Sequence, residues 1–404
     1  MNDSKFSHTE ETSFTTQEMM AETVKSKNRL TIGIPKENYE EEKRLALTPE
    51  AVDMIVDAGH RVILETEAGL GINYSDNRYS ENGAEIVKNK EAVFQSDIVF
   101  KILPPTLEEI GMMKQRSTIC SMLQLPDFSK ETILAMTGKK LNGIGYELIS
   151  EDNGKCYPIR TSISEIEGAA AISVASELLS NAHGGKGVLL GGVPGVAPTE
   201  VIIIGAGAAG TIAARAALGL GALVKVFDNN VEKLRDIQSI LGRTLFTSVF
   251  HPNVLLNAFR TADVVIGAIH TNLPVRYLIT EDIVKTMKKG ALIIDLRINQ
   301  GGCFETSCFL PKDHPKIFDK YGVLHYCIPN LSSRVARTTS MALSNIFVPF
   351  IIQMGESGGF TKMTKSDYDF HSGFYMYAGK LVSQYVSGYF NLPSNDIGLF
   401  LSAY

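Results

Sequence analysis

A glycine-rich turn between an apolar run and a stretch of small residues constrains the fold of this chain most. It lies within VIIIGAGAAGTIAARAALGLGALVKVFDNN, residues 201–230, and reads Gly205-Ala206-Gly207-Ala208-Ala209-Gly210, which fits G-x-G-x-x-G. In a strand–turn–helix unit Gly205 permits the tight turn, Gly207 lets the backbone approach a pyrophosphate, and Gly210 lets helix and strand pack closely. The pattern predicts a dinucleotide-binding unit.

Asp228 ends the next apolar run, eighteen residues after Gly210. In such a unit the pyrophosphate lies at the helix N-terminus, where free N–H groups and the helix dipole favour negative charge. The Asp228 carboxylate would accept hydrogen bonds from the adenosine ribose hydroxyls, and it would repel a 2′-phosphate. These residues therefore favour NAD(H) over NADP(H) as the cofactor.

Short apolar runs alternate with segments of helix length through most of the chain. The runs are continuously apolar, as expected for strands that helices cover on both faces. They form one series before the glycine-rich turn and one from it onward. Two series predict an α/β fold with two doubly wound, Rossmann-like domains and a cleft between them. The candidate strands are residues 31–35, 61–66, 97–103, 117–123 and 142–148, then 201–207, 223–228, 263–269, 291–296 and 322–328.

Length and composition agree with a soluble two-domain protein. The 404 residues exceed what one hydrophobic core normally holds. The chain is 44% hydrophobic with a net charge of −5, which argues against a general nucleic-acid binder. The first 29 residues are polar and lack an apolar core, so we expect a flexible leader rather than a signal peptide. No run approaches the roughly 20 apolar residues that a membrane span needs.

The five cysteines are spread along the chain without a C-x-x-C pair. This spacing predicts no metal site, and reduced thiols fit a cytoplasmic protein best. Two further segments carry local signals. The Gly- and Pro-rich residues 184–198 (GGKGVLLGGVPGVAP) are interpreted as a hinge or active-site loop rather than a plain connection. The tail after about residue 355 is rich in Tyr and Phe and is interpreted as a helix that packs on a domain or a partner subunit.

Several motifs in order resemble the alanine dehydrogenase family, which includes the NAD(H)-binding part of proton-translocating transhydrogenase. They are GIPKENYEEEKRLALTP (33–49), GVLLGGVPGVAP (187–198), VIIIGAGAAG, DLRINQGGCFE (295–305) and IPNLSSRVARTTSMALSN (328–345). The resemblance covers about residues 30–355. It implies an NAD(H)-binding domain, residues 159–332, inside a substrate domain made of residues 30–158 and 333–404, after a leader of residues 1–29.

The resemblance also implies an activity and a site. Alanine dehydrogenases interconvert L-alanine and pyruvate plus ammonia with NAD. Arg44 matches the arginine that binds the substrate carboxylate, a role for which a planar guanidinium is suited. Ile269, Asn299 and Asn330 are expected beside the cofactor. The family implies a small-molecule substrate from amino-acid metabolism and a homo-oligomer such as a hexamer.

Three positions depart from the family pattern. Leu103 stands where the family has a substrate-binding lysine, Gln124 where it has a proton-carrying histidine, and Asn299 where it has an aspartate. Leucine cannot pair with a carboxylate, and the two amides cannot exchange a proton at neutral pH. Loss of a general acid–base group typically slows a reaction about 100- to 10,000-fold.

Two hypotheses therefore stay open. In the first, the chain is an NAD-dependent dehydrogenase of alanine or a related amino acid that uses other groups; candidates are Lys36, Lys101, Arg160, Glu165, Arg297 and Arg334. In the second, it is a transhydrogenase-like or catalytically degenerate NAD(H)-binding protein without small-molecule turnover. An enzyme would gather charged groups around Arg44, whereas a binding protein would show an apolar or blocked cleft there, with Leu103 filling it.

Overall fold

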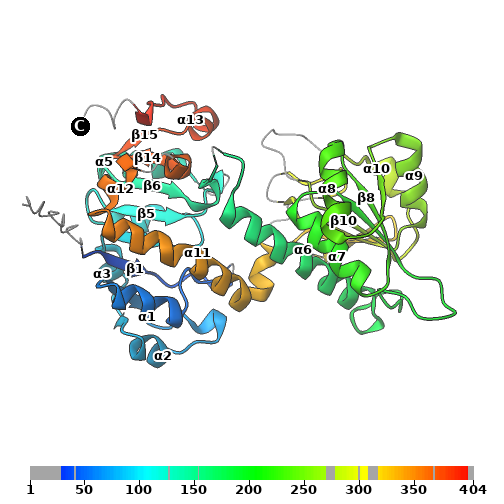
Figure 1. Cartoon of the computed structure of the whole chain (residues 1–404), viewed down its shortest axis with the longest axis horizontal. Helices are drawn as coiled ribbons and strands as arrows, with labels where there is room; N and C mark the ends of the chain where they lie inside the picture. The colour runs from blue at the N-terminus through cyan, green and yellow to red at the C-terminus, as the bar shows by residue number, and fades with distance from the viewer. Residues whose placement is uncertain are drawn as a thin grey trace, which may run out of the picture.

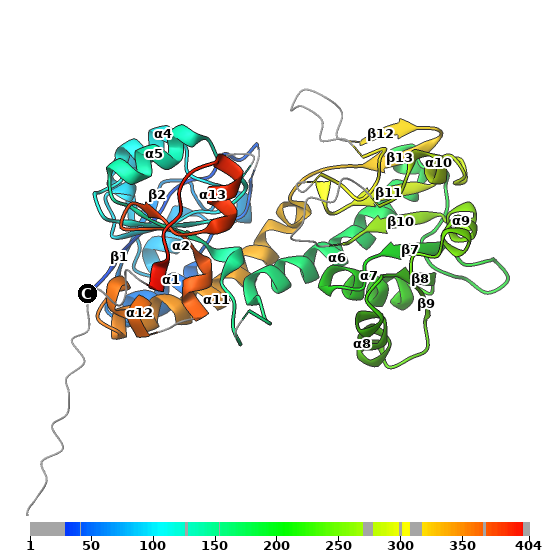
Figure 2. The same ribbon diagram turned by 90° about the horizontal axis from the view of Figure 1, so that it is seen from above.

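Two α/β units, each built around its own sheet, are joined by a pair of long helices (Figures 1 and 2). The prediction of two Rossmann-like domains is therefore confirmed. The computed structural model describes residues 29–40, 42–125, 128–152, 154–269, 278–298, 301–307, 317–366 and 369–398.

The first sheet has eight strands in the order β15-β14-β6-β5-β4-β1-β2-β3, and its first six strands in the chain are parallel. Its central strands are buried on both faces, which explains their continuous apolar runs. The strand bounds are β1 (Thr31–Ile34), β2 (Arg61–Glu65), β3 (Glu85–Val87), β4 (Ile98–Phe100), β5 (Thr118–Ser121), β6 (Asn142–Gly145), β14 (Phe374–Tyr377) and β15 (Lys380–Leu381).

Helices cover both faces of this sheet, and each face has its own apolar core. One face carries α1 (Pro49–Asp57), α2 (Asp76–Glu81), α11 (Ala336–Glu356) and α12 (Phe360–Ser366). The other carries α3 (Lys90–Phe94), α4 (Leu107–Met112), α5 (Lys130–Gly138) and α13 (Gln384–Phe390). The short 3-10 helices are η1 (Leu70–Ile72), η3 (Tyr146–Leu148) and η7 (Asp369–Gly373).

The aromatic tail adds two strands to the first sheet, so its interpretation as a helix was wrong for residues 374–381. β14 pairs antiparallel with β6, and β15 folds back on β14. The turn between them is two residues, Ala378 and Gly379, both with positive φ, which is the backbone of a tight hairpin. Tyr375 is fully buried and packs where a side chain at Gly143 would lie. Phe374 and Tyr375 therefore complete the cores on the two faces of the sheet, whereas Tyr385 and Tyr389 of α13 are exposed.

The second sheet has seven strands in the order β12-β13-β11-β10-β7-β8-β9, all parallel except β12. From β7 the chain first runs outward through β8 and β9, and then returns to the other side of β7 with β10. This reversal opens a crevice at the carboxyl ends of β7 and β10, where ligands bind in such sheets. The strand bounds are β7 (Glu200–Ile204), β8 (Leu223–Phe227), β9 (Phe246–Ser248), β10 (Val264–Gly267), β11 (Leu292–Asp295), β12 (Ile317–Lys320) and β13 (Val323–Tyr326).

Helices also cover both faces of the second sheet. One core is shared with α6 (Pro158–Leu179), α7 (Ala208–Gly219) and α8 (Val231–Leu241), and the other with α9 (Pro252–Thr261) and α10 (Glu281–Val284). Two 3-10 helices, η4 (Asn181–His183) and η6 (Leu331–Val335), follow α6 and precede α11. α6 and α11 run side by side between the two units (Figures 1 and 2).

Serine hydroxyls of η6 and α11 fasten the loop that follows β1. Ser333 Oγ accepts the Lys43 N–H at 3.1 Å, Ser340 Oγ accepts the Leu45 N–H at 2.8 Å, and Ser344 Oγ accepts the Thr48 N–H at 2.9 Å. These bonds satisfy backbone donors that no strand pairs. The division at residues 158/159 and 332/333 stays a prediction, and it falls at the start of α6 and within η6.

One segment is long and apolar enough to cross a membrane by length and composition alone. It runs over Leu331–Glu356, within the part of the chain that the structure describes; its most apolar 18-residue window has a mean hydropathy of 1.3, and 44% of that window is buried. The expectation that no run approaches a membrane span was therefore wrong on composition. Its buried side chains, among them Leu343, Phe347 and Ile351, belong to the first core.

Candidate active site

The glycine-rich turn joins β7 to α7 at the crevice of the second sheet. Gly205 has a φ of 114°, and a side-chain carbon there would lie 2.8 Å from the Ala268 backbone. A side-chain carbon at Gly210 would lie 1.9 Å from the Gly205 carbonyl oxygen. At Gly207, by contrast, such a carbon would meet nothing within 4 Å. Two glycines are therefore required by close packing, and the third faces open space.

Asp228 follows β8 and points its carboxylate back at the turn. Its Oδ2 accepts the Ala206 N–H at 2.9 Å, and its Oδ1 accepts the Asn230 N–H at 2.8 Å. Ala208 and Ala209 begin α7, and Ile269, just after β10, lies close to Gly205. The turn, the acid and Ile269 therefore meet at one edge of the sheet.

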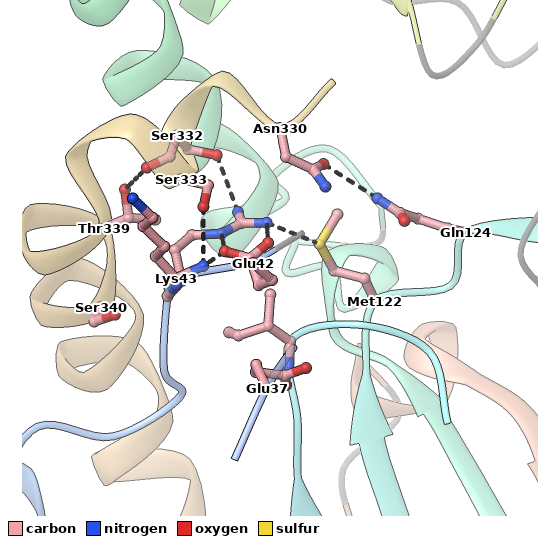
Figure 3. Close-up of polar contacts among 12 residues, drawn as sticks. Glu37, Glu42, Lys43, Met122, Gln124, Asn330, Ser332, Ser333, Thr339 and Ser340 are labelled. Atoms are coloured by element: carbon pink, nitrogen blue, oxygen red, sulfur yellow. Dashed lines mark hydrogen bonds and ion pairs between the residues drawn. The ribbon is translucent and has the colours of Figure 1, made fainter. Parts of the chain in front are cut away.

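Arg44 is enclosed by ionic and hydrogen-bonding partners at the junction of the two units. It is 1% exposed and forms a two-point ion pair with Glu42, Nε to Oε1 at 2.8 Å and Nη2 to Oε2 at 2.6 Å. Nη1 donates to Ser332 Oγ at 3.0 Å, and Nη2 also contacts the Met122 sulfur at 3.8 Å. Figure 3 shows Glu42, Met122 and Ser332 converging from three separate segments.

A second carboxylate, that of Glu167 on α6, completes this cluster. Ser332 Oγ donates to Glu167 Oε1 at 3.0 Å, so one serine links Arg44 to Glu167. Burial raises the pKa of the Glu167 carboxyl, although Arg44 and the bonds from Ser332 oppose the shift. Glu42, Arg44, Glu167 and Ser332 thus form one connected group, the arginine cluster.

Lys101 is also paired internally. Its Nζ lies 2.9 Å from Glu37 Oε2 and 3.6 Å from Glu109 Oε1, and all three side chains are buried. Glu37 additionally accepts the Ile102 N–H at 2.6 Å, which fixes the end of β4. Leu103 follows directly and is half-buried. The ion pairs of Lys101 thus stabilise the segment that follows β4, and the side chain of Leu103, two residues further on, is apolar.

Gln124 and Asn330 bring the two units into direct contact. Gln124 Nε2 donates to Asn330 Oδ1 at 3.2 Å (Figure 3). Asn330 has a φ of 54° and begins η6. Leu123, the residue before Gln124, donates its N–H to Glu147 Oε1 at 2.6 Å. The Gln124 and Asn330 amides therefore form a hydrogen bond between the two units, and Glu147 positions the segment that carries Gln124.

The Glu147 carboxyl is a candidate for titration near neutrality. Burial raises its pKa from the usual value of 4.5 to about 7, and its Oε2 atom has no hydrogen-bond partner. Because the folded pKa lies above the unfolded one, the folded protein holds the extra proton between these values. Stability from this group is therefore present at low pH and is lost as the pH rises through about 7.

Replacing Glu147 with Gln should flatten this dependence. Gln cannot ionise, and its carbonyl can still accept the Leu123 N–H. We expect the free energy of unfolding of Glu147→Gln, relative to the native chain, to rise by about 2 kcal/mol between pH 5 and pH 8. Urea unfolding at both values measures it. The exposed Glu108→Gln serves as control, and parallel pH profiles for all three proteins would contradict the prediction.

The other predicted candidates lie in diverse settings. Lys36 pairs with Glu67 at 2.7 Å, Arg160 stacks on the Tyr157 ring at 3.7 Å, and Glu165 is exposed. Arg297 is 4% exposed, so it is not a solvated surface residue, and Arg334 pairs with Glu177 at 2.6 Å. Asn299 lies outside the described residues.

The loop of residues 184–198 lies at the opposite end of the second sheet from the glycine-rich turn. The Gly192 N–H donates to the Leu220 carbonyl at 3.2 Å, and the Leu223 N–H donates to the Thr199 carbonyl at 2.9 Å. Both contacts are at the amino ends of β7 and β8, whereas the crevice is at their carboxyl ends. Its interpretation as an active-site loop was therefore wrong, because a Gly-rich composition does not tell which end of a sheet a loop occupies.

A cavity of about 180 Å³ lies away from these residues. It is lined by side chains of the segment before α6 and of α6, α11 and α12, including Ile149, Ile159, Phe350 and Met363. None of the predicted site residues lines it. Charged groups do converge on Arg44, as the enzyme hypothesis requires, but they also enclose it.

Sequence reasoning missed Glu42, Glu147, Glu167 and Ser332. A local signal existed for Glu42, which precedes Arg44 by two residues, so that both side chains can share one side of an extended segment. Glu167 stands immediately before a run of small apolar residues in a helix, a place where an acid needs a partner. No local signal could have linked either of them to Ser332.

The fold and the turn define a two-domain α/β protein of the dinucleotide-binding class. Models of the alanine dehydrogenase/PNT N-terminal and C-terminal domains match residues 33–167 and 171–384. The alanine dehydrogenase of Bacillus subtilis (strain 168) is 37% identical over 328 residues, 81% of this chain and 86% of that protein. That of Staphylococcus saprophyticus is 36% identical over 367 residues, 91% of this chain and 98% of that protein. The chain belongs to the alanine dehydrogenase/PNT family.

Solved structures agree with this assignment. A structure of L-alanine dehydrogenase superposes with a TM-score of 0.83 at 32% identity and covers 90% of this chain and 99% of its own. The transhydrogenase of Sinorhizobium meliloti superposes with a TM-score of 0.73 at 23% identity over 88% of this chain and 99% of its own. The second likeness shows the fold alone.

Proposed function

We propose that the chain is an NAD(H)-dependent oxidoreductase that acts on CH–NH2 groups and interconverts an amino acid, or a close derivative, with a 2-oxo compound plus ammonia. The glycine-rich turn carries this proposal most directly. Open space above Gly207, close packing at Gly205 and Gly210, and the Asp228 carboxylate form the setting that a dinucleotide needs.

NADH would supply the hydride when bound, and the chain supplies binding and orientation. The N-terminal N–H groups of α7 would hold the pyrophosphate, and Asp228 would accept hydrogen bonds from the adenosine ribose. Asn330 bonds Gln124 at the junction, and Ile269 lies close to Gly205. The nicotinamide would lie between these two places, next to Gln124. These residue roles are proposed from the place of Ile269 after β10 and of Asn330 before η6. The role of Asn299, which lies outside the described residues, is proposed from the family resemblance alone.

The amide pair can orient a substrate but cannot carry a proton. Gln124 and Asn330 offer donors and acceptors to a carbonyl or an amine. Proton transfer must then use water or one of the carboxyl groups near the junction, Glu147 or Glu167, whose pKa values are raised by burial. We therefore expect a slower reaction than a histidine would support.

NADH titration by calorimetry, followed by NADH oxidation with ammonium and a panel of 2-oxo compounds, tests the proposal. We expect saturable binding and ammonium-dependent turnover of at least one compound. NADH binding without turnover of any compound would instead favour the second candidate, a binding protein without small-molecule chemistry. The enclosure of Arg44 and the apolar Leu103 are the observations that favour this alternative.

Cofactor preference gives a separate prediction. In Asp228→Asn the negative charge that opposes a 2′-phosphate is removed, while one oxygen still accepts a backbone N–H. We expect the ratio of NADPH to NADH dissociation constants to fall at least tenfold, about 1.4 kcal/mol. Fluorescence titration measures both constants. The exposed Asp236→Asn on α8 is the control, and an unchanged ratio in Asp228→Asn would remove Asp228 from the cofactor site.

We further propose a cytoplasmic homo-oligomer whose two units close over substrate. Exposed apolar side chains support association: Leu189, Val193 and Val196 on the loop before β7, and Leu220 and Leu223 around the start of β8. Such side chains gathered at one edge favour contact with another protein surface. Size-exclusion chromatography with light scattering measures the oligomeric state.

A further inference from the structure

The guanidinium of Arg44 has little capacity left for a substrate. Of its five N–H groups, the two on the Nε–Nη2 edge are taken by Glu42, one on Nη1 by Ser332, and the other on Nη2 faces the Met122 sulfur. A two-point carboxylate interaction needs two parallel N–H groups on one edge. The edge that Glu42 leaves joins Nη1 and Nη2; Ser332 bonds Nη1, and the Met122 sulfur faces Nη2.

Ser332 is held in this position from two sides. Its hydroxyl donates to Glu167 Oε1, and its carbonyl accepts the Thr339 hydroxyl at 2.9 Å on the first turn of α11. The residue is fully buried. Because the Ser332 proton goes to Glu167, the serine oxygen presents its acceptor side to Arg44, so the three groups support one another.

The negative charges near Arg44 also disfavour a substrate carboxylate. The arginine cluster contains one cation and two carboxylates, Glu42 and Glu167. The next cation along the first sheet, Lys101, faces Glu37 and Glu109, and Leu103 beside it is apolar. A substrate carboxylate brought to Arg44 would add a third negative charge at short range and would have to displace Ser332.

We propose that Glu167, which is linked to Arg44 through Ser332, determines substrate specificity, so that the enzyme disfavours small free 2-oxo acids and favours substrates whose group at this position is a neutral amide. The inference rests on the proposed function for its substrate class. A primary amide can donate to a carboxylate and accept from an arginine, whereas a carboxylate can only accept. The cluster therefore matches an amide better than an acid.

Pyruvate and pyruvamide form a matched pair for the test, because they differ only in a carboxylate against an amide. Both are titrated into the protein–NADH complex by calorimetry and assayed with NADH and ammonium. The native chain should bind pyruvamide more tightly. In Glu167→Gln the preference should shift toward pyruvate at least tenfold, because the negative charge is gone. In Ser332→Ala, which keeps Glu167, both ligands should bind more tightly and the preference for pyruvamide should stay. Ser173→Ala, an exposed serine of α6, is the control.

Each outcome decides one point. A shift in the binding ratio without turnover of either compound would support the specificity role and contradict the proposed function. Turnover of pyruvate with a ratio that Glu167→Gln does not change would support the proposed function and overturn the specificity role. Equal weakening of both ligands would also overturn it, since that marks a merely structural role. Binding of neither ligand by any variant overturns it as well. NADH affinity in each variant reports that the fold is intact.

Discussion

Gly210→Ala is expected to abolish tight NADH binding. The added carbon would lie 1.9 Å from the Gly205 carbonyl oxygen, and neither atom belongs to a flexible side chain. The turn and the start of α7 must therefore separate, and the N–H groups that would hold the pyrophosphate lose their alignment. We expect at least a 100-fold rise in the NADH dissociation constant, about 2.7 kcal/mol, by calorimetry.

Two other glycines of the same region provide a control and a second test. A carbon added at Gly219, at the other end of α7, meets nothing within 4 Å, so Gly219→Ala should leave NADH binding unchanged. Gly207 also has open space, so Gly207→Ala should fold normally and yet bind NADH weakly, because the new methyl group takes the place of the pyrophosphate. Native affinity in Gly210→Ala or in Gly207→Ala would contradict this account of the turn.

Arg44→Met is expected to destabilise the first unit strongly. It leaves Glu42, which is fully buried, without its cation. Breaking a buried ion pair on one side typically costs about 3–5 kcal/mol, because an uncompensated charge stays in the interior. Urea unfolding followed by circular dichroism measures the loss. Part of it should return in Arg44→Met/Glu42→Gln, where the orphaned charge is gone.

The surface pair Arg61–Glu85 serves as comparison. Both side chains are about half exposed, 48% and 49%, and water can hydrate Glu85 when its partner is removed. Arg61→Met should therefore cost less than about 1 kcal/mol. Equal losses of unfolding free energy in Arg44→Met and Arg61→Met would mean that water reaches Glu42 in the variant, so that Arg44 does not keep this region dry.

Local patterns in the sequence predicted the parts of this structure that neighbouring residues determine. The glycine-rich turn, its strand and Asp228 lie within 28 residues, and each has a physical requirement that the residue type reveals. The ten candidate strands all appear in the two sheets, because continuous apolar runs mark strands that are buried on both faces, whereas the short edge strands β3, β9 and β12 carry no such run and were missed. The hairpin at Ala378 and Gly379 was missed, although two turn residues between short apolar runs are a recognised signal.

The arginine cluster could be predicted only in part. The residue type of Arg44 indicated an anion partner, but that partner could be a substrate or a side chain. Glu167 is more than 120 residues away in the chain and Ser332 nearly 290, so their convergence depends on how α6 and η6 cross between the units. Only the fold therefore shows that the partners of Arg44 are Glu42 and Ser332 of the chain itself.

Transfer of deuterium from deuterated NADH to an organic product tests directly whether the chain catalyses reductive amination. The protein is incubated with the labelled cofactor, ammonium and the panel of 2-oxo compounds, pyruvamide included, and products are analysed by mass spectrometry. The account predicts an amine that carries both deuterium and the nitrogen of the ammonium. Tight NADH binding with no labelled amine from any compound would contradict it, and would make the chain a binding protein.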